Sequence, residues 1–286
     1  MKSGLARFKT SDGLKLQGLL YEPENKTDKI VIHVHGAAGN FYENKFIDDF
    51  SVAFTKAGYA FLAFNNRGSG YETEMVREQD EVKDYPVIGM LNEIFEECVL
   101  DIEAAIAFAK NMGYNEIVLQ GHSLGCNKVI WPATQKNFAG KIILLAPCDL
   151  VRHNDKPSVD SVEKARELVA AGKLLEKVPY FWGNWWNASA NTLVSVWGGG
   201  TNADMFSYRN GRLVPALADL KNPILVLIGT DDNCYDNKDK KPVIKYLQTA
   251  FASADLSLSL IESANHWYSG KEEKVSENIV NWLNKF

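Results

Sequence analysis

The sequence predicts an α/β protein, with a mostly parallel central sheet and helices on both of its faces. Six short apolar runs alternate with segments of helical periodicity, which is the pattern of a sheet built from strand–helix repeats. One of these runs ends in a Gly-x-Ser-x-Gly sequence at residues 121–125. The chain has 286 residues, enough for one large domain or for one domain that carries an insertion.

The expected strands follow one another along the chain. Residues 13–23 alternate between polar and apolar positions, which is typical of an exposed, antiparallel strand. Dense runs of β-branched residues and leucine are typical of strands buried on both faces. Such runs lie at residues 28–36, 58–68, 115–121, 140–149 and 222–232, and a more alternating run lies at 256–266.

The expected helices lie between these strands. Apolar residues at three- and four-residue steps predict helices over residues 45–59 and 92–112, and Gly113 is a typical residue to end the second. Residues 124–135 follow the serine motif and form a further expected helix. Residues 274–286 have the pattern of a short amphipathic helix.

One segment breaks this alternation. About 70 residues separate the strand that ends near Asp149 from the one that begins at Asn222, far more than a crossover needs. Residues 158–175 have a polar helical pattern, and residues 178–200 hold four of the seven tryptophans. We therefore expect an α/β core at residues 1–149 and 222–286, and a largely helical cap (lid) inserted at 150–221.

Composition restricts the classes of partner. The net charge of −5 and the lack of a Lys/Arg block argue against a nucleic-acid partner. The first residues have no apolar core of a signal peptide, and the apolar runs are too short to cross a membrane. Cys98, Cys126, Cys148 and Cys234 form no CxxC pair, which indicates neither a zinc site nor a disulfide framework. We expect a cytoplasmic protein with reduced thiols and no membrane partner.

The sequence Gly121-His-Ser123-Leu-Gly125 predicts a nucleophile elbow. A serine on a tight strand-to-helix turn adopts strained backbone angles, and its neighbours two positions away must be small to avoid collision across the turn. This geometry exposes the Ser123 hydroxyl at the carboxyl end of the sheet. The N–H of Leu124 then lies at a helix N-terminus, where it can stabilise an oxyanion.

A serine hydroxyl is a weak nucleophile and needs a base, which in turn needs a carboxylate. Among the five histidines, His266 follows the last strand and precedes the final helix, a position from which a base reaches the carboxyl ends of the strands. Asp231 and Asp232 follow the preceding strand, and the spacing from Gly229 favours Asp232. Asp231 stays open as the acid, and Asp149 is a more remote choice.

The second oxyanion donor should come from an early loop. The sequence "HVHGAAGN" follows the first buried strand, and the N–H of Ala37 is the expected donor. Gly36 and Gly39 would allow the backbone to approach the serine closely.

These motifs, "HGAAG", "NNRGSG", "GHSLG", "GTDD" and "NHW" in this order, resemble those of the α/β-hydrolase superfamily over nearly the whole chain outside the cap. The resemblance implies the α/β-hydrolase fold, with Ser123 as the nucleophile, Asp232 as the acid and His266 as the base. It also implies that Ala37 and Leu124 supply the oxyanion hole.

The chain departs from the superfamily pattern at one turn. In "NNRGSG", Asn65 or Asn66 stands where the superfamily often has an acid. That turn is structural in the superfamily, so the departure leaves the catalytic assignment unchanged. Within the superfamily the chain looks most similar to capped intracellular esterases.

The expected activity is hydrolysis of a carboxylic ester, with an aromatic or medium-chain acyl group, through an acyl-serine intermediate. A carbon–carbon bond hydrolase, a lactonase or a thioesterase with the same triad is the alternative. A metal hydrolase is a third interpretation, since His33 and His35 share one face of a strand, although no further ligand lies nearby. A non-catalytic ligand-binding module is the most distant alternative, because a suitable residue stands at every catalytic position.

The expected substrate contacts are His122 and three cap tryptophans, Trp182, Trp185 and Trp186. Aromatic side chains there would line an apolar pocket, or else form the core of the cap or its seat on the main domain. No cofactor and no metal ion is expected. The expected partner is a small-molecule ester, and a homo-oligomer stays open.

Overall fold

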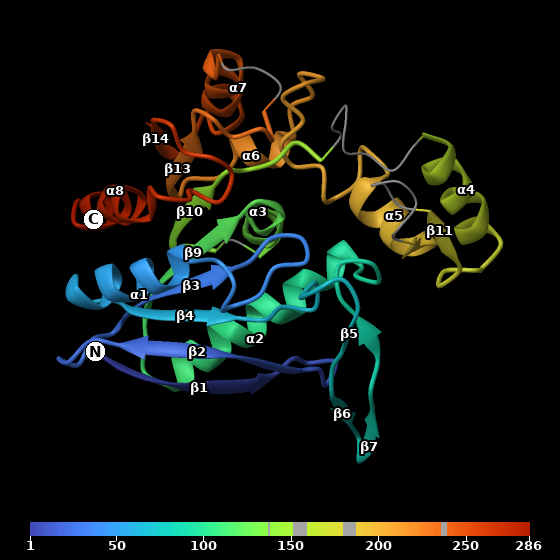
Figure 1. Ribbon diagram of the computed structural model, residues 1–286, viewed down its shortest axis with the longest axis horizontal. Helices are drawn as coiled ribbons and strands as arrows, with labels where there is room; N and C mark the ends of the chain where they lie inside the picture. The colour runs from blue at the N-terminus through green and yellow to red at the C-terminus, as the bar shows by residue number, and fades with distance from the viewer. Residues whose placement is uncertain (137, 151–158, 180–186, 236–238) are drawn as a thin grey trace.

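The structure, a computed structural model, describes residues 1–286 except 137, 151–158, 180–186 and 236–238 (Figure 1). Its centre is a sheet with the strand order β1 (Lys2–Lys9), β2 (Lys15–Glu22), β4 (Ala60–Phe64), β3 (Lys29–Val34), β9 (Glu116–His122), β10 (Lys141–Leu145), β13 (Pro223–Gly229) and β14 (Asp255–Ile261). β2 pairs antiparallel with β1 and with β4, whereas every pair from β4 to β14 is parallel.

Helices cover both faces of this sheet (Figure 1). The helices that the structure describes are α1 (Phe46–Lys56), α2 (Cys98–Asn111), α3 (Leu124–Lys136), α4 (Val159–Ala170), α5 (Ala190–Trp197), α6 (Pro215–Ala218), α7 (Lys241–Ala250) and α8 (Glu272–Leu283), with a 3-10 turn η1 (Phe95–Glu97). The apolar sides of α1 and α8 pack into one core layer, and those of α2, α3 and α7 pack into the other. No described helix combines the length and the apolar character that a membrane span requires.

The predicted α/β class is confirmed, and each run expected to be a strand contains one. Two further elements, β1 and α7, are not predicted by the apolar pattern of the sequence. β1 is an antiparallel edge strand that is largely exposed, so its side chains show no clean apolar alternation. α7 has its buried residues at helical spacing, Val243, Tyr246, Leu247 and Ala250, but begins among lysines.

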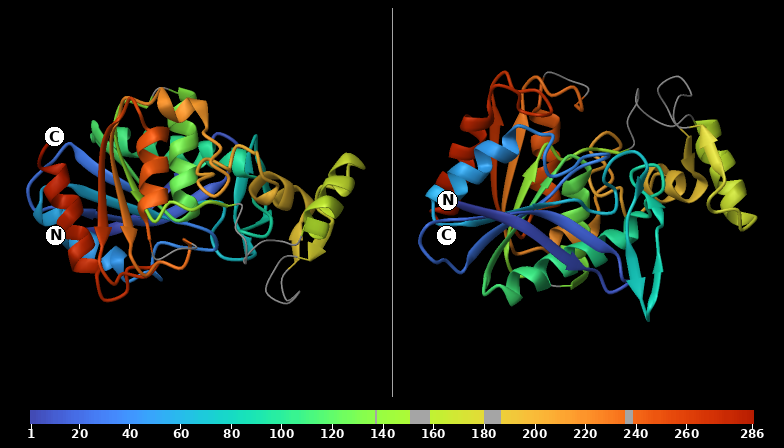
Figure 2. Two further views of the ribbon diagram at one scale, coloured as in Figure 1. Left: turned by 90° about the horizontal axis from the view of Figure 1, so that it is seen from above. Right: turned by 60° about the horizontal axis from the view of Figure 1, so that its bottom comes forward.

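The segment between β4 and α2 forms two small antiparallel ribbons that the sequence pattern does not predict. β5 (Thr73–Glu74) pairs with β8 (Val87–Ile88), and β6 (Arg77–Gln79) pairs with β7 (Val82–Asp84). Figure 2 shows them projecting beyond the sheet. Strands of two or three residues with charged side chains give no readable apolar period.

Between β10 and β13 the chain leaves the sheet and forms α4, α5 and the short pair β11 (Lys177–Pro179) and β12 (Asn187–Ser189). These elements project to one side of the sheet (Figure 2). Their buried residues pack with Leu91, and the Phe95 N–H donates to Ser195 Oγ over 2.8 Å. The inserted elements are therefore seated on the segment that leads into α2, and the boundaries expected for a cap stay a prediction.

Candidate active site

Ser123 occupies the turn between β9 and α3. Its backbone has a φ of 56°, in the left-handed region that a residue with a side chain rarely adopts. The Ser123 N–H donates to Leu145 O over 2.9 Å, which fixes the turn to the neighbouring strand β10. Such strain persists where surrounding structure holds it, and it is frequent at functional sites.

The glycines around Ser123 make room for backbone. A Cβ atom on Gly121 would collide with the backbone of Gly125, and one on Gly125 would collide with Val34 O. A Cβ on Gly36 would lie 2.8 Å from the Ser123 Cβ. All three glycines are therefore required by close packing, within the elbow and between the elbow, β3 and the loop that follows β3.

Asp232 and His266 form a buried pair at the carboxyl ends of β13 and β14. The Nδ1 atom of His266 and Oδ2 of Asp232 are 2.9 Å apart, and the two residues are 6 % and 1 % exposed. Burial favours a raised pKa for Asp232. Hydrogen bonds from His266 and from the Cys234 N–H outweigh it and hold the pKa below its ordinary value. An ionised Asp232 therefore orients a His266 that is protonated at Nδ1.

The other two candidate acids lie elsewhere. Asp231 is exposed, and its carboxylate accepts from Thr230 Oγ1. Asp149 is buried and accepts the Arg209 N–H over 2.9 Å. Of the three carboxylates, Asp232 is the one with a hydrogen bond to His266.

Asn66 holds the start of the loop that carries Ala37, through two hydrogen bonds to His35. The N–H of Asn66 donates to His35 Nε2 over 3.1 Å, and its side-chain amide donates to His35 O over 3.3 Å. Asn66 Oδ1 in turn accepts from Lys128 Nζ, whose main partner is Glu93 at 2.6 Å. A chain of buried polar contacts thus supports the expected oxyanion loop.

Leu124 is the first residue of α3, so no bond within the helix uses its N–H. The expected oxyanion residues Ala37 and Leu124 flank the place where the Gly36 backbone meets Ser123. The structure therefore places the loop of Ala37 beside the serine, and the role of the two N–H groups as oxyanion donors stays a prediction.

The histidine pair suggested for a metal hydrolase is engaged in other contacts. His35 Nε2 accepts from Asn66, and Nδ1 lies 2.9 Å from Gly36 O. Burial, with repulsion from Lys128, lowers the pKa of His35 to about 3, so the ring is neutral. The ring of His33 packs against Phe46. Because both nitrogens of His35 bond within the protein, this pair gives no support to a metal centre.

His122 lies in the core layer of α1 and α8 rather than at an open surface. It is 3 % exposed, and its ring packs 5.1 Å from Phe46 and 6.3 Å from Tyr268. Nε2 donates to His266 O over 2.8 Å. This enclosed position does not support the expected contact between His122 and substrate, and indicates instead that His122 holds the backbone of His266.

The remaining expected contacts, Trp182, Trp185 and Trp186, lie outside the described residues. Sequence reasoning missed two other groups at the site. Cys148 Sγ lies 3.6 Å from Ser123 Oγ, and the Cys234 N–H donates to Asp232 Oδ1 over 2.7 Å. Both cysteines lie in loops that follow strands, at the same sheet edge as the serine, which is the signal that could have identified them.

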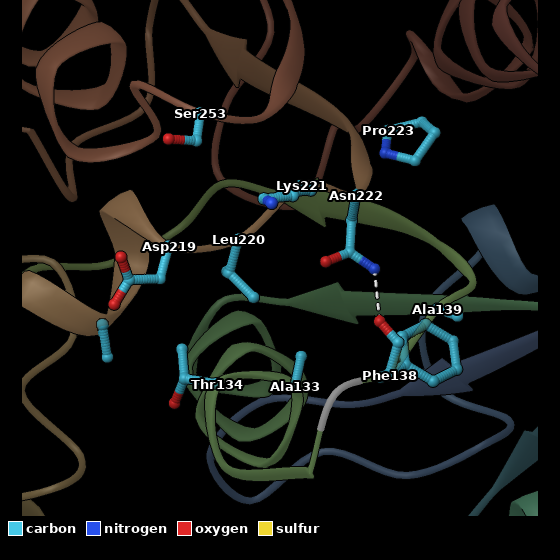
Figure 3. A pocket seen from close by; sticks show the side chains of 11 residues that line it. Ala133, Thr134, Phe138, Ala139, Asp219, Leu220, Lys221, Asn222, Pro223 and Ser253 are labelled. Atoms are coloured by element: carbon cyan, nitrogen blue, oxygen red, sulfur yellow. Dashed lines mark hydrogen bonds between the residues drawn. The ribbon is translucent and has the colours of Figure 1, made fainter.

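A cavity lined by described residues lies away from this site. A cavity of ≈ 640 Å³ lies between the end of α3 and the start of β13, lined in part by Thr134, Phe138, Asp219 and Asn222 (Figure 3). Asn222 donates to Phe138 O over 2.5 Å at its rim. Phe138 precedes β10 and Asn222 precedes β13, so the cavity lies at the amino ends of the strands. The candidate active site is at the carboxyl ends.

Comparisons with known proteins agree with this architecture. The sequence matches the family described as protein of unknown function, DUF1749, over residues 15–286. No curated protein matches it. The fold is similar to that of Est1E from Butyrivibrio proteoclasticus, solved with ferulic acid bound, with a TM-score of 0.64, 19 % identity and 98 % coverage of both chains.

Two further solved structures share the fold. The Pyrococcus furiosus esterase Pf2001 has a TM-score of 0.62 and 18 % identity over 100 % of this chain and 91 % of that chain. The α/β hydrolase GrgF from Penicillium sp. sh18 has a TM-score of 0.65 and 16 % identity over 100 % of this chain and 99 % of that chain. The chain therefore has the α/β-hydrolase fold, as the motifs imply.

Proposed function

This chain belongs to the DUF1749 family, and we propose that it is a serine hydrolase that cleaves a carboxylic ester through an acyl-enzyme intermediate. The observation that carries the proposal is the buried 2.9 Å contact between Asp232 and His266. It lies at the same sheet edge as Ser123, whose φ of 56° is that of a strained elbow. Two esterases among the structural neighbours favour an ester over other substrates of this fold.

The first half of the proposed reaction acylates the serine. His266 Nε2 takes the Ser123 proton while Oγ forms a bond to the ester carbonyl carbon. The N–H groups of Ala37 and Leu124 donate to the resulting oxyanion. When the carbon–oxygen bond of the ester breaks, His266 returns the proton to the leaving alcohol.

The second half releases the acid. A water molecule gives a proton to His266 and adds to the acyl carbon, and the same two N–H groups stabilise the second oxyanion. Cleavage of the acyl bond then returns the proton to Ser123 Oγ. The sum is one ester and one water converted to one acid and one alcohol, with no cofactor.

The acyl group is proposed to be aromatic or of medium length. The cap at residues 150–221 is proposed to cover it, since the sequence places Trp182, Trp185 and Trp186 there. The ferulic acid bound to Est1E makes hydroxycinnamoyl esters the first aromatic class to assay.

The test is covalent labelling with a fluorophosphonate, followed by mass spectrometry to locate the modified residue. Labelling at Ser123, and its loss in Ser123→Ala, would support the proposal, together with turnover of aryl and medium-chain p-nitrophenyl esters. Ser51→Ala is the matched control, because Ser51 is a buried serine in α1 whose hydroxyl bonds to Asp48 O. A folded protein that takes no label would contradict the assignment of Ser123 as a nucleophile.

A further inference from the structure

Three side chains with metal-ligating atoms meet beside Ser123. Cys148 follows β10, Cys234 follows β13 and His266 follows β14, and these three strands are neighbours in the sheet. The two Sγ atoms and a ring nitrogen of His266 all lie within 4.8 Å of one another, and all three residues are buried. Parallel strands thus bring three distant parts of the chain to one point.

Two thiolates and an imidazole are a ligand set that zinc prefers. Zinc binds sulfur at about 2.3 Å and nitrogen at about 2.0 Å in a tetrahedron, so ligand atoms about 3.5–3.8 Å apart fit it. Because the three atoms lie within 4.8 Å of one another, no pair has to close by more than about 1.3 Å. We infer that Cys148, Cys234 and His266 bind one Zn²⁺ ion, and that the bound ion inhibits the enzyme.

Asp232 prepares two of these three ligands. Its Oδ2 atom lies 2.9 Å from His266 Nδ1, so Nε2 is the ring nitrogen that would bind the metal. A metal-bound histidine commonly donates its other N–H to a carboxylate in this way. The Oδ1 atom of the same carboxylate accepts the Cys234 N–H over 2.7 Å. One buried carboxylate therefore orients both residues.

Binding exchanges protons for the metal. Each thiol loses its proton as Sγ bonds to Zn²⁺, so one ion releases two protons and no group is oxidised or reduced. Ser123 is partly exposed, and its Oγ lies 3.6 Å from Cys148 Sγ. The hydroxyl, or a water molecule beside it, is therefore placed to complete a four-ligand shell.

Metal binding and catalysis compete for one atom. The lone pair of His266 Nε2 is the one that would take the proton of Ser123, and in the metal complex it is bound to zinc. The inhibitory consequence rests on the proposed function. The metal site itself does not, because it needs only the three ligands.

Cobalt(II) tests the site directly, since a bond from cobalt to a thiolate gives a charge-transfer absorption band. The full-length reduced protein should show this band at one equivalent of cobalt, and Zn²⁺ should displace it. Cys148→Ser and Cys234→Ser should each weaken the band, because one of the two thiolates is lost, and should weaken binding by about tenfold or more. Cys98→Ser should retain both, because Cys98 is an equally buried cysteine in α2.

The unmodified protein gives a second readout. Zn²⁺ should slow alkylation of Cys148 and Cys234, and one equivalent should suppress fluorophosphonate labelling of Ser123 until a chelator is added. A folded protein without the band, or a band that is unchanged in both serine variants, would overturn the metal site. The two proposals can also fail separately. If the protein shows the band but, when free of metal, neither takes the label nor cleaves esters, the proposed function is overturned and the metal site stands.

Discussion

The side chain of His122 donates to the backbone carbonyl of His266 over 2.8 Å. The residue before the proposed nucleophile therefore supports the backbone of the proposed base. Burial, with repulsion from His266, lowers the pKa of His122 to about 3, so the ring stays a neutral donor at physiological pH.

His122→Phe should lower kcat about tenfold and leave KM nearly unchanged, because it removes one positioning bond and no substrate contact. His122→Gln, which restores a donor, should recover part of the loss. The check is steady-state kinetics across pH. A rise in KM with kcat unchanged would instead place His122 against the substrate.

Asp232→Asn should lower kcat by about 10⁴, because an amide neither fixes the Nδ1–H tautomer of His266 nor stabilises the charged ring. Asp231→Asn is the matched control. Asp231 is the adjacent residue, is exposed, and has no bond to His266, so its variant should keep its activity. Equal losses in the two variants would contradict the assignment of Asp232 as the acid.

Gly36→Ala should reduce kcat by about 10²–10³, because the added methyl pushes the Ala37 loop away from Ser123 and displaces one oxyanion donor. Gly4→Ala is the control, since nothing lies within 4 Å of a Cβ at that position. Fluorophosphonate labelling rates measured beside ester kinetics show whether the serine itself remains reactive.

Lys128→Met should destabilise the fold by about 3–5 kcal/mol, because it leaves the Glu93 carboxylate buried without its cation. The double variant Lys128→Met with Glu93→Leu should recover most of that stability, since it removes both charges. Urea unfolding of the single and double variants measures the coupling. Lys164→Met, which breaks an exposed ion pair with Glu167, should change stability little.

A falling pH should lower the free energy of unfolding, because the buried histidines are neutral in the folded protein. The pKa values of His35 and His122 are about 3, below the ordinary 6.5, and burial also lowers the pKa of His33. Unfolding therefore takes up protons as the pH falls from 6.5 toward 3. His35 and His122 should each remove about 1.4 kcal/mol of stability per pH unit within that window.

Urea unfolding at pH 7 and at pH 5 tests this pH dependence. The difference in the free energy of unfolding between pH 7 and pH 5 should be smaller in His122→Gln, by roughly the contribution of one histidine. An unchanged difference would mean that His122 is already protonated in the folded protein at pH 5.

The sheet could be predicted from sequence because buried parallel strands are continuous apolar runs, and each such run in this chain contains a strand. Ser123, Asp232 and His266 could be predicted because each lies in the turn or loop that follows a strand. The expected roles of these residues stay predictions. β1 and the ribbons between β4 and α2 could not be predicted, because partly exposed or very short strands carry no apolar period.

The surroundings of the triad depend on contacts between distant segments. The direction of the His122 side chain follows from the strained turn that exposes Ser123, and no periodicity reveals it. The approach of Cys148 to Cys234 depends on the strand order, which places β10 next to β13. Sequence spacing alone gave these cysteines no common site.

The strand order also sets a sequence of events during synthesis. Ser123 and its elbow leave the ribosome well before His266, and a domain generally folds as a unit. β14, which positions His266, can pair only with β13. A partly synthesised chain therefore carries a serine that has no base, and the proposed hydrolase gains its activity only when the outermost parallel strand docks.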